Sequence, residues 1–229
     1  RAGLFYKLKG LMDPCLWRLL YNYYGKSKII VKFNGERSDL ISTSEGVKQG
    51  GIISPFLFNF FIDSLLRACV EKELGAKIAS VNLSIIGYCD DLIIMSPVVR
   101  HAQLLLTLCE EYANVWKMDF NARKSASLEF GKGGWDSDFV MKGQVLPRVT
   151  EITYLGLPLS TVPKYDFFDA KMRKVEKAFY SLHGLGCKPR HLSAFSMAFV
   201  YKQYCQSIVR YGMESVSYTH LRAHETDSY

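Results

Sequence analysis

Residues 46–59 read Gly-Val-Lys-Gln-Gly-Gly-Ile-Ile-Ser-Pro-Phe-Leu-Phe-Asn, and residues 88–91 read Tyr-Cys-Asp-Asp. In the first stretch, glycines precede Ser54 and Pro55, two residue types that favour the start of a helix, with serine as the N-cap. The second stretch separates two short apolar runs that are rich in strand-forming residues. Together they predict a glycine-rich loop that leads into a helix, followed by a β-hairpin with an acidic tip.

The rest of the chain predicts further helices and antiparallel strands. Amphipathic spacing and Gly or Pro boundaries predict helices in the ranges 16–24, 55–74, 102–116, 167–182 and 193–211. Apolar runs beside turn residues predict strands in the ranges 29–33, 39–42, 81–86, 92–95, 126–130, 139–141, 145–146 and 153–155. The fold class is therefore α+β, with an antiparallel sheet and packed helices over residues 1–160 and a helical region over residues 161–215.

Composition excludes several classes of protein. The 229 residues include 48% hydrophobic side chains and carry a net charge of +7, which is typical of a globular chain rather than a disordered, collagen-like or coiled-coil one. The six cysteines contain no Cys-x-x-Cys pair, so we expect reduced thiols in an intracellular protein, with nucleus or cytoplasm left open. The sequence contains no run of about 20 apolar residues, so it predicts no membrane span.

Charge is distributed unevenly along the chain. The first fifty residues and the residues after 160 carry a surplus of Lys and Arg, whereas the middle is slightly acidic. Two basic flanks around an acidic centre are typical of a protein that binds a polyanion around a cation site. The alternative is a set of solvated surfaces with a chance excess of basic residues.

Asp90 and Asp91 are the sharpest candidates for chemistry. Adjacent carboxylates repel one another, and a divalent cation relieves that repulsion at a rigid hairpin tip. Side chains alternate along a strand, so we expect one of the two to do most of the metal binding unless the turn bends them together. A two-metal site needs a further carboxylate from elsewhere in the fold, and the alternative is a solvated turn.

The glycine-rich loop is the second candidate. Glycines let a backbone approach a nucleotide or a strand closely, and Lys48 and Gln49 add a cation and an amide beside it. No Gly-Lys-Ser/Thr follows, so the loop is not of the Walker type. A purely structural loop before a capped helix is the alternative.

At this point the motifs resemble those of a known family. Residues 46–59 and the Asp tip are similar to motifs B and C of reverse transcriptases, most closely those of non-LTR (LINE-type) retrotransposons. Residues 121–125, Asn-Ala-Arg-Lys-Ser, resemble motif D, and residues 154–156, Tyr-Leu-Gly, resemble the motif that closes the palm in this branch. The resemblance implies a right-hand polymerase, with a partial palm over residues 1–160 and a helical thumb over residues 161–215.

The resemblance also assigns roles. It implies that Asp90 and Asp91 are catalytic and bind metal, with two Mg²⁺ ions in the complete enzyme, and that Lys124 acts near the pyrophosphate leaving group. It implies a substrate-binding set that lies against the incoming nucleotide and template, made of Gln49, Gly50, Gly51 and Tyr88. The implied partners are an RNA template, a DNA primer and dNTP, with no membrane and an unknown oligomeric state.

The helical region carries basic residues that the resemblance would place along a duplex backbone. They are Lys171, Arg173, Lys174 and Lys177. A solvated helix face is the equal alternative. Asp13 is interpreted as a turn residue.

Two features depart from the family pattern. The motif A aspartate, the other metal ligand, is missing, and we expect motif A to have ended just before Arg1. We therefore expect a reverse transcriptase fragment that is inactive alone, or alternatively a non-catalytic nucleic-acid-binding remnant or maturase-like RNA-binding protein. Residues 216–229 match no thumb and are interpreted as a non-native or disordered tail, in which His220 and His224 lack a third metal ligand.

Overall fold

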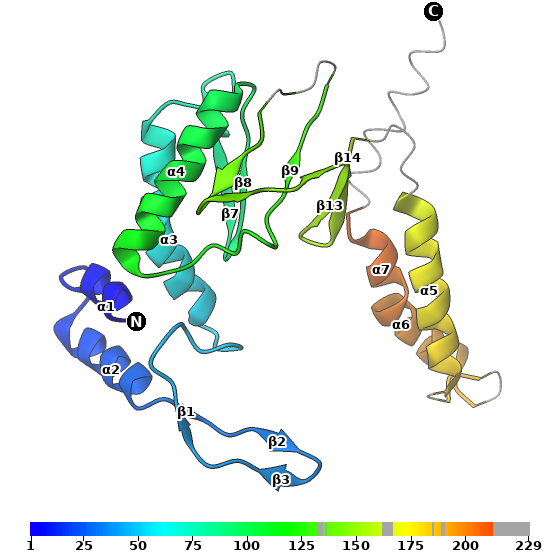
Figure 1. Ribbon diagram of the computed structural model, residues 1–229. Coiled ribbons are helices and arrows are strands. Elements are labelled where there is room, and N and C mark those ends of the chain that lie inside the picture. The colour runs from blue at the N-terminus through cyan, green and yellow to red at the C-terminus, as the bar shows by residue number, and fades with distance from the viewer. Residues whose placement is uncertain (132–134, 136, 162–166, 185, 189–190, 213–229) are drawn as a thin grey trace, which may run out of the picture. The chain divides into compact units, whose positions relative to one another are not determined.

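The computed structural model describes residues 1–131, 135, 137–161, 167–184, 186–188 and 191–212. The chain forms two compact units (Figure 1). The first unit contains Arg1–Ser127 and Gly133–Arg148, and the second contains Leu128–Lys132 and Val149–Tyr229. No helix among the described residues is long and apolar enough to cross a lipid bilayer.

Three helices of the first unit confirm the predicted helical ranges, and a short helix precedes them. In chain order they are α1 (Ala2–Leu8), α2 (Pro14–Gly25), α3 (Ser54–Glu71) and α4 (Val99–Trp116). Asp13 lies in the turn before α2 and is also its N-cap, because its carboxylate accepts hydrogen bonds from the Cys15 N–H at 2.8 Å and the Leu16 N–H at 3.2 Å. The cap and Pro14 together fix where this helix begins.

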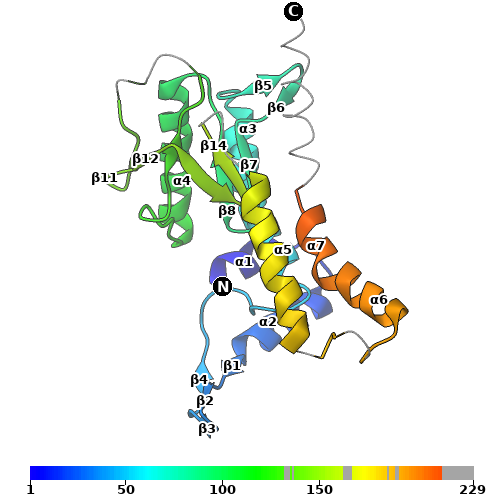
Figure 2. The same cartoon turned by 90° about the vertical axis from the view of Figure 1, so that its right-hand side faces the viewer.

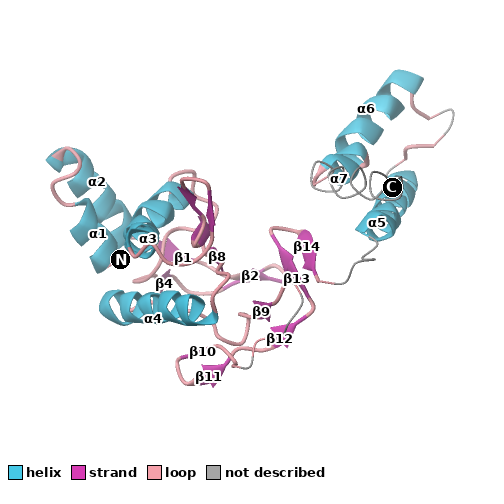
Figure 3. Cartoon of the chain, turned by 90° about the horizontal axis from the view of Figure 1, so that it is seen from above, coloured by secondary structure: helices cyan, strands magenta, loops and turns pink. Residues whose placement is uncertain are grey.

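The strands of the first unit pair locally instead of joining into the one antiparallel sheet that the sequence predicted (Figure 3). The antiparallel pairs are β1 (Lys28–Ile29) with β4 (Ile41–Ser42), β2 (Lys32–Phe33) with β3 (Glu36–Arg37), β5 (Lys77–Ile78) with β6 (Val81–Asn82), β7 (Ile85–Tyr88) with β8 (Asp91–Ile94), and β10 (Val140–Met141) with β11 (Gln144–Val145). One reason is visible in the apolar run 81–86. The Asn82 side chain accepts a hydrogen bond from the Ser84 N–H at 2.8 Å, and this turn divides the run into two strands.

The Asn34-Gly35 turn confirms the predicted hairpin between β2 and β3. Asn34 has φ +48° and Gly35 has φ +84°, and positive φ at both positions is the requirement of a type I′ turn. This hairpin lies at the far end of an extended arm, away from α3 (Figures 1 and 2). Phe33 on the arm is 76% exposed.

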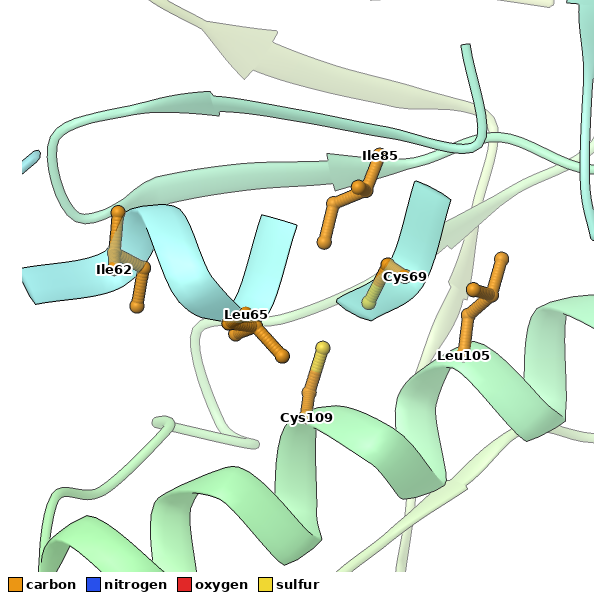
Figure 4. Packing of buried hydrophobic residues seen from close by; sticks show 6 residues of the cluster. All are labelled: Ile62, Leu65, Cys69, Ile85, Leu105 and Cys109. Atoms are coloured by element: carbon orange, nitrogen blue, oxygen red, sulfur yellow. The ribbon is translucent and has the colours of Figure 1, made fainter. Parts of the chain in front are cut away.

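The main core of the first unit lies where α3, α4 and β7 meet. Its buried members are Ile62, Leu65 and Cys69 of α3, Ile85 of β7, and Leu105 and Cys109 of α4. Figure 4 shows Ile85 pointing from the hairpin toward the two helices, and the thiols of Cys69 and Cys109 pointing toward one another. Burial of these side chains fixes the hairpin on α3 and thereby fixes the direction of its tip.

The second unit combines a hairpin with three helices. Its elements are β13 (Glu151–Tyr154), β14 (Leu157–Ser160), α5 (Phe167–Gly184), α6 (Ala194–Tyr204) and α7 (Gln206–Arg210). The Tyr211 hydroxyl, just after α7, donates a hydrogen bond to the Leu155 carbonyl in the β13–β14 turn. The hairpin therefore groups with the helices in the second compact unit.

Two further predictions concern the strand expected over residues 126–130 and the tail expected over residues 216–229. The short strands β9 (Ser127–Leu128) and β12 (Arg148–Val149) lie where the chain passes from one unit to the other, and β9 is shorter than the predicted strand 126–130. The predicted tail, residues 216–229, lies outside the described residues.

Candidate active site and nucleic-acid interface

The acidic tip is a two-residue turn between β7 and β8. Four residue pairs form the ladder, and the last pair before the turn is Tyr88 with Asp91. Cys89 and Asp90 occupy the turn itself, and Cys89 has φ +51°. A non-glycine residue with positive φ is uncommon and carries strain, so the strain of the turn lies at Cys89, directly before the acidic pair.

The two faces of the hairpin differ. Ile85, Leu92 and Ile94 pack in the core beside α3. Cross-strand partners share a face and successive residues alternate, so Tyr88 and Asp91 lie on the opposite face, where Tyr88 is 62% exposed. Asp91 therefore points away from α3, while Asp90 sits in the turn.

Strand β7 of the hairpin runs antiparallel to α3. A Cβ atom built at Gly75, after the helix, would lie 2.6 Å from Ser84 Cβ, whereas one at Gly87 would lie 3.3 Å from Leu66 Cδ1. Beyond Gly87 only Tyr88 remains in β7, about 3 Å farther along, before the turn of Cys89 and Asp90, and the N-terminus of α3 lies about 18 Å beyond Leu66. The acidic tip therefore points toward the end of α3 at which the glycine-rich loop begins the helix.

The carboxylates of Asp90 and Asp91 are exposed, and neither makes a hydrogen bond or ion pair with a described residue. Oxygen ligands of this kind suit Mg²⁺, which keeps several waters and needs only one or two carboxylates. The pair therefore fits a hard divalent cation. In the described part of the chain, no group of three or more His, Cys, Asp or Glu side chains gathers as a metal site.

The glycine-rich loop has a defined shape. Gly50 has φ +76°, and a Cβ atom at Gly51 would lie 2.7 Å from Ser54 Oγ and 3.1 Å from the Lys48 carbonyl oxygen. Gly50 therefore requires glycine because of its positive φ, and Gly51 requires it because a side chain there would collide with Ser54 and the Lys48 carbonyl. Gln49 directly precedes Gly50 and is exposed.

Ser54 does not act as the predicted N-cap. It is the first residue of α3, whose N-cap is Ile53, and it is 5% exposed. Its hydroxyl donates to the Lys48 carbonyl at 2.5 Å and lies 3.3 Å from the Tyr24 hydroxyl. The hydroxyl thus ties the loop to α2 and α3. The sequence pattern does not reveal this partner, because the Lys48 carbonyl comes within reach of Ser54 only in the folded loop.

Arg1 is a second loop-holding residue that sequence reasoning missed. Its guanidinium donates to the Gly46 carbonyl at 2.7 Å, to the Tyr24 carbonyl at 2.7 Å and to the Thr43 carbonyl and hydroxyl. The guanidinium carries several N–H donors in a fixed planar arrangement, so one side chain can join the loop to the end of α2. No motif in the sequence marks this residue.

Lys124 lies in a turn after α4. The Asn121 side chain accepts hydrogen bonds from the N–H groups of Arg123 at 3.1 Å and Lys124 at 3.3 Å. Lys124 is exposed, and no hydrogen bond or ion pair links its side chain to Asp90 or Asp91. The predicted turn is confirmed, while the predicted role of the lysine stays a prediction.

The basic residues of α5 divide into two groups. Arg173, Lys174 and Lys177 are exposed and form what we call the α5 basic face. Lys171 is only 8% exposed, its ammonium lies 3.5 Å from the Val209 carbonyl and 5.6 Å from the Tyr211 ring centre, and burial lowers its pKa, assisted by the charge of Lys174. The expectation that Lys171 lies along a duplex backbone is therefore wrong, because α7 covers it.

Comparison with known proteins assigns the class. The reverse transcriptase (RNA-dependent DNA polymerase) family matches residues 6–159, which is more than half of the chain. The chain belongs to this family.

Its curated relatives are non-LTR retrotransposons, which confirms the LINE-type resemblance. The RNA-directed DNA polymerase from mobile element jockey of Drosophila funebris is 28% identical over 69% of the chain, and that of Drosophila melanogaster is 22% identical over 77%. The Pol polyprotein of the R2DM retrotransposable element of Drosophila melanogaster is 29% identical over 51%. The chain spans 18%, 19% and 10% of the lengths of these three proteins.

Proposed function

We propose that this chain supplies the metal-binding tip and the nucleotide-facing loop of an RNA-directed DNA polymerase. The complete enzyme would extend the 3′-hydroxyl of a DNA primer on an RNA template with dNTP, using two Mg²⁺ ions. The observation that carries the proposal is the direction of the β7–β8 hairpin, which aims Asp90 and Asp91 toward the glycine-loop end of α3. Family membership supports the same reaction class, because reverse transcriptases use divalent metal ions.

Each group in the proposed site has a distinct task. Asp90 and Asp91 hold the cation, which when bound stabilises the charge that develops on phosphoryl oxygens. The open backbone at Gly50 lets a nucleotide or template base approach, the crowded Gly51 fixes the shape of the loop, and Gln49 offers an amide beside them. Asp90 and Asp91 together supply fewer carboxylates than two metals need, so the second ion requires a further ligand such as the motif A aspartate.

The same proposal covers the larger architecture and the remaining residues. Residues 1–160 would belong to the palm and residues 161–215 to the thumb, in an intracellular protein that does not enter a membrane. Lys124 would act near the pyrophosphate, and Tyr88, exposed beside the tip, would contact the substrate.

Metal binding tests the tip directly. We expect the full chain to bind Mn²⁺, measured by electron paramagnetic resonance, and to bind dNTP only when a divalent ion is present. Asp90→Asn should weaken Mn²⁺ binding at least tenfold, whereas Asp63→Asn, at a half-exposed carboxylate of α3 paired with Arg67, should leave it unchanged. Equal loss in the two variants would refute the metal assignment.

Primer extension tests the reaction. The chain is joined behind an upstream reverse transcriptase segment that contains a motif A aspartate. We expect this chimera to extend a DNA primer on RNA, and we expect Asp90→Asn to abolish extension while duplex binding persists. Extension that survives the substitution would contradict the proposed role of Asp90.

A non-catalytic nucleic-acid-binding protein is the second candidate. The observation that favours it is that the described residues gather only two carboxylates at the tip. Such a protein would bind RNA–DNA duplex with a steep salt dependence and without Mg²⁺. Divalent-dependent binding of dNTP distinguishes the polymerase site from this alternative.

A further inference from the structure

A basic pocket lies beside the glycine-rich loop, on the side of α2. Its volume is about 430 Å³. Three lysines line it, namely Lys26, Lys28 and Lys48, together with the polar side chains of Asn22 and Ser27 and the side chains of Leu19 and Tyr23, which supply apolar surface. We call this site the lysine pocket.

Three separate elements build the lysine pocket. Asn22 and Tyr23 lie in the last turn of α2, and Lys26 follows as its C-cap, four residues after Asn22 and three after Tyr23. Lys28 opens β1 directly after the helix, and Lys48 comes from the glycine-rich loop, where its ammonium lies 3.2 Å from the Tyr23 hydroxyl. The pocket is therefore built by segments that the fold brings together, not by one run of charged sequence.

The loop wall of the pocket is held in place. The Lys48 carbonyl accepts the Ser54 hydroxyl at 2.5 Å, so the backbone that carries this lysine is anchored to α3. The Lys48 ammonium also lies 5.5 Å from the centre of the Tyr23 ring. A cation held over a ring is restrained without being neutralised, because the ring contributes no charge.

Positive charge converges at the lysine pocket without a counterion from the protein. In the described residues, no Asp or Glu forms an ion pair with Lys26, Lys28 or Lys48. Like charges that share one hollow repel, and a bound anion relieves this repulsion. The Asn22 amide and the Ser27 hydroxyl add neutral hydrogen-bond donors, which suit the several oxygens of a phosphate group.

We propose that the lysine pocket binds a phosphate group, and that the phosphate belongs to the backbone of a nucleic-acid strand. The identification of the strand rests on the proposed polymerase function, whereas the phosphate chemistry rests on the pocket alone. A nucleoside triphosphate offers the same chemistry, so the test must separate the two sources.

Lysine footprinting locates the ligand on the full chain. Acetylation of lysines by an N-hydroxysuccinimide ester is measured by mass spectrometry without ligand, with a ten-nucleotide single-stranded RNA, with dNTP and with tripolyphosphate. We expect the RNA to slow acetylation of Lys26, Lys28 and Lys48 at least threefold. Lys9 and Lys72, which are exposed elsewhere in the first unit, should react at unchanged rates.

Each footprinting outcome has one meaning. Protection by RNA supports the proposal. Protection by tripolyphosphate and dNTP alone supports a phosphate site but overturns the strand assignment. Protection of the three lysines by none of the three ligands, or equal protection of Lys9 and Lys72, overturns the phosphate site itself.

Two matched double variants give an independent readout. Lys26→Gln with Lys28→Gln should lower RNA affinity and reduce the slope of log K against log salt by about 1.4, because each phosphate contact on a single strand contributes about 0.7. Lys9→Gln with Lys72→Gln removes the same charge and should change the slope little. Equal slopes in the two variants would overturn the proposal, while Asp90→Asn, which tests the metal site, should leave the footprint unchanged.

Discussion

Lys7 is the residue on which α1, α3 and α4 converge. Its ammonium donates to the Phe61 carbonyl at 2.8 Å, to the Tyr112 hydroxyl at 2.6 Å and to Ser64 Oγ. It also lies 4.6, 4.8 and 4.2 Å from the ring centres of Phe61, Tyr112 and Trp116. Burial lowers the pKa of Lys7 and the charge of Asp63 opposes this effect, so the ammonium is held mainly by hydrogen bonds and rings.

Replacement of Lys7 by methionine should therefore destabilise the first unit. The substitution keeps an apolar stem but removes the charged donor shared by the Phe61 carbonyl, the Tyr112 hydroxyl and Ser64 Oγ, and leaves Phe61 with the Tyr112 hydroxyl alone, at a cost of about 1–3 kcal/mol. The expected loss of thermal midpoint is about 2–4 °C per kcal/mol, measured by circular dichroism. Lys9→Met, on the exposed end of α1, is the control, and an equal loss there would show that Lys7 has no special role.

Cys89 carries the strain of the acidic tip. Its φ of +51° is unfavourable for any side chain, and worst for a β-branched one. Cys89→Val should lower the free energy of unfolding by about 1–3 kcal/mol, whereas Cys89→Gly should leave it equal or slightly higher. Urea unfolding measures both, with Cys15→Val on the exposed face of α2 as the control, and a Cys89→Val variant as stable as the wild type would contradict the strained turn.

The packing of α3 on α4 predicts a pH dependence at the scale of the elements. The thiol–thiol hydrogen bond with Cys69, together with burial, raises the pKa of Cys109 above its ordinary value, while the same bond lowers the pKa of Cys69. The folded state therefore keeps a proton that the unfolded chain releases above about pH 8.5, so stability falls as the pH rises through that value.

Cys109→Ala should reduce this alkaline loss of stability. The single thiol accounts for at most about 1.4 kcal/mol of the loss of unfolding free energy between pH 7.5 and 9.5. Urea unfolding at the two pH values measures this loss. Cys15→Ala, which removes an exposed thiol, should leave the loss unchanged. A loss as large in Cys109→Ala as in the wild type would contradict the raised pKa.

The same scale shows what the sequence can and cannot predict. The β7–β8 hairpin was predictable because apolar runs flank a polar tip, and α4 because its apolar residues recur at helical spacing. The hydrogen-bond partner of Ser54 was not predictable, since the Lys48 carbonyl becomes an acceptor only in the folded loop. The burial of Lys171 depends on α7, 38 residues farther along at Val209, and no local pattern encodes that contact.

At the scale of the whole molecule, the net charge of +7 makes binding of polyanions the general expectation. Exposure decides which charges contribute, because a buried ammonium cannot release counterions from a nucleic acid. The α5 basic face is exposed, whereas Lys171 on the same helix is occupied by the Val209 carbonyl and the Tyr211 ring.

Substitution of all three residues of the α5 basic face by glutamine should therefore weaken binding of RNA–DNA duplex. The slope of log K against log salt should fall by about 2.7, because each contact with duplex phosphate contributes about 0.9, as measured by fluorescence anisotropy at several salt concentrations. Lys171→Gln should instead lower the thermal midpoint and leave the slope unchanged. A triple control on the first unit, Lys9, Lys72 and Lys117 to glutamine, removes the same charge, and an equal fall in its slope would show that binding follows net charge rather than this helix face.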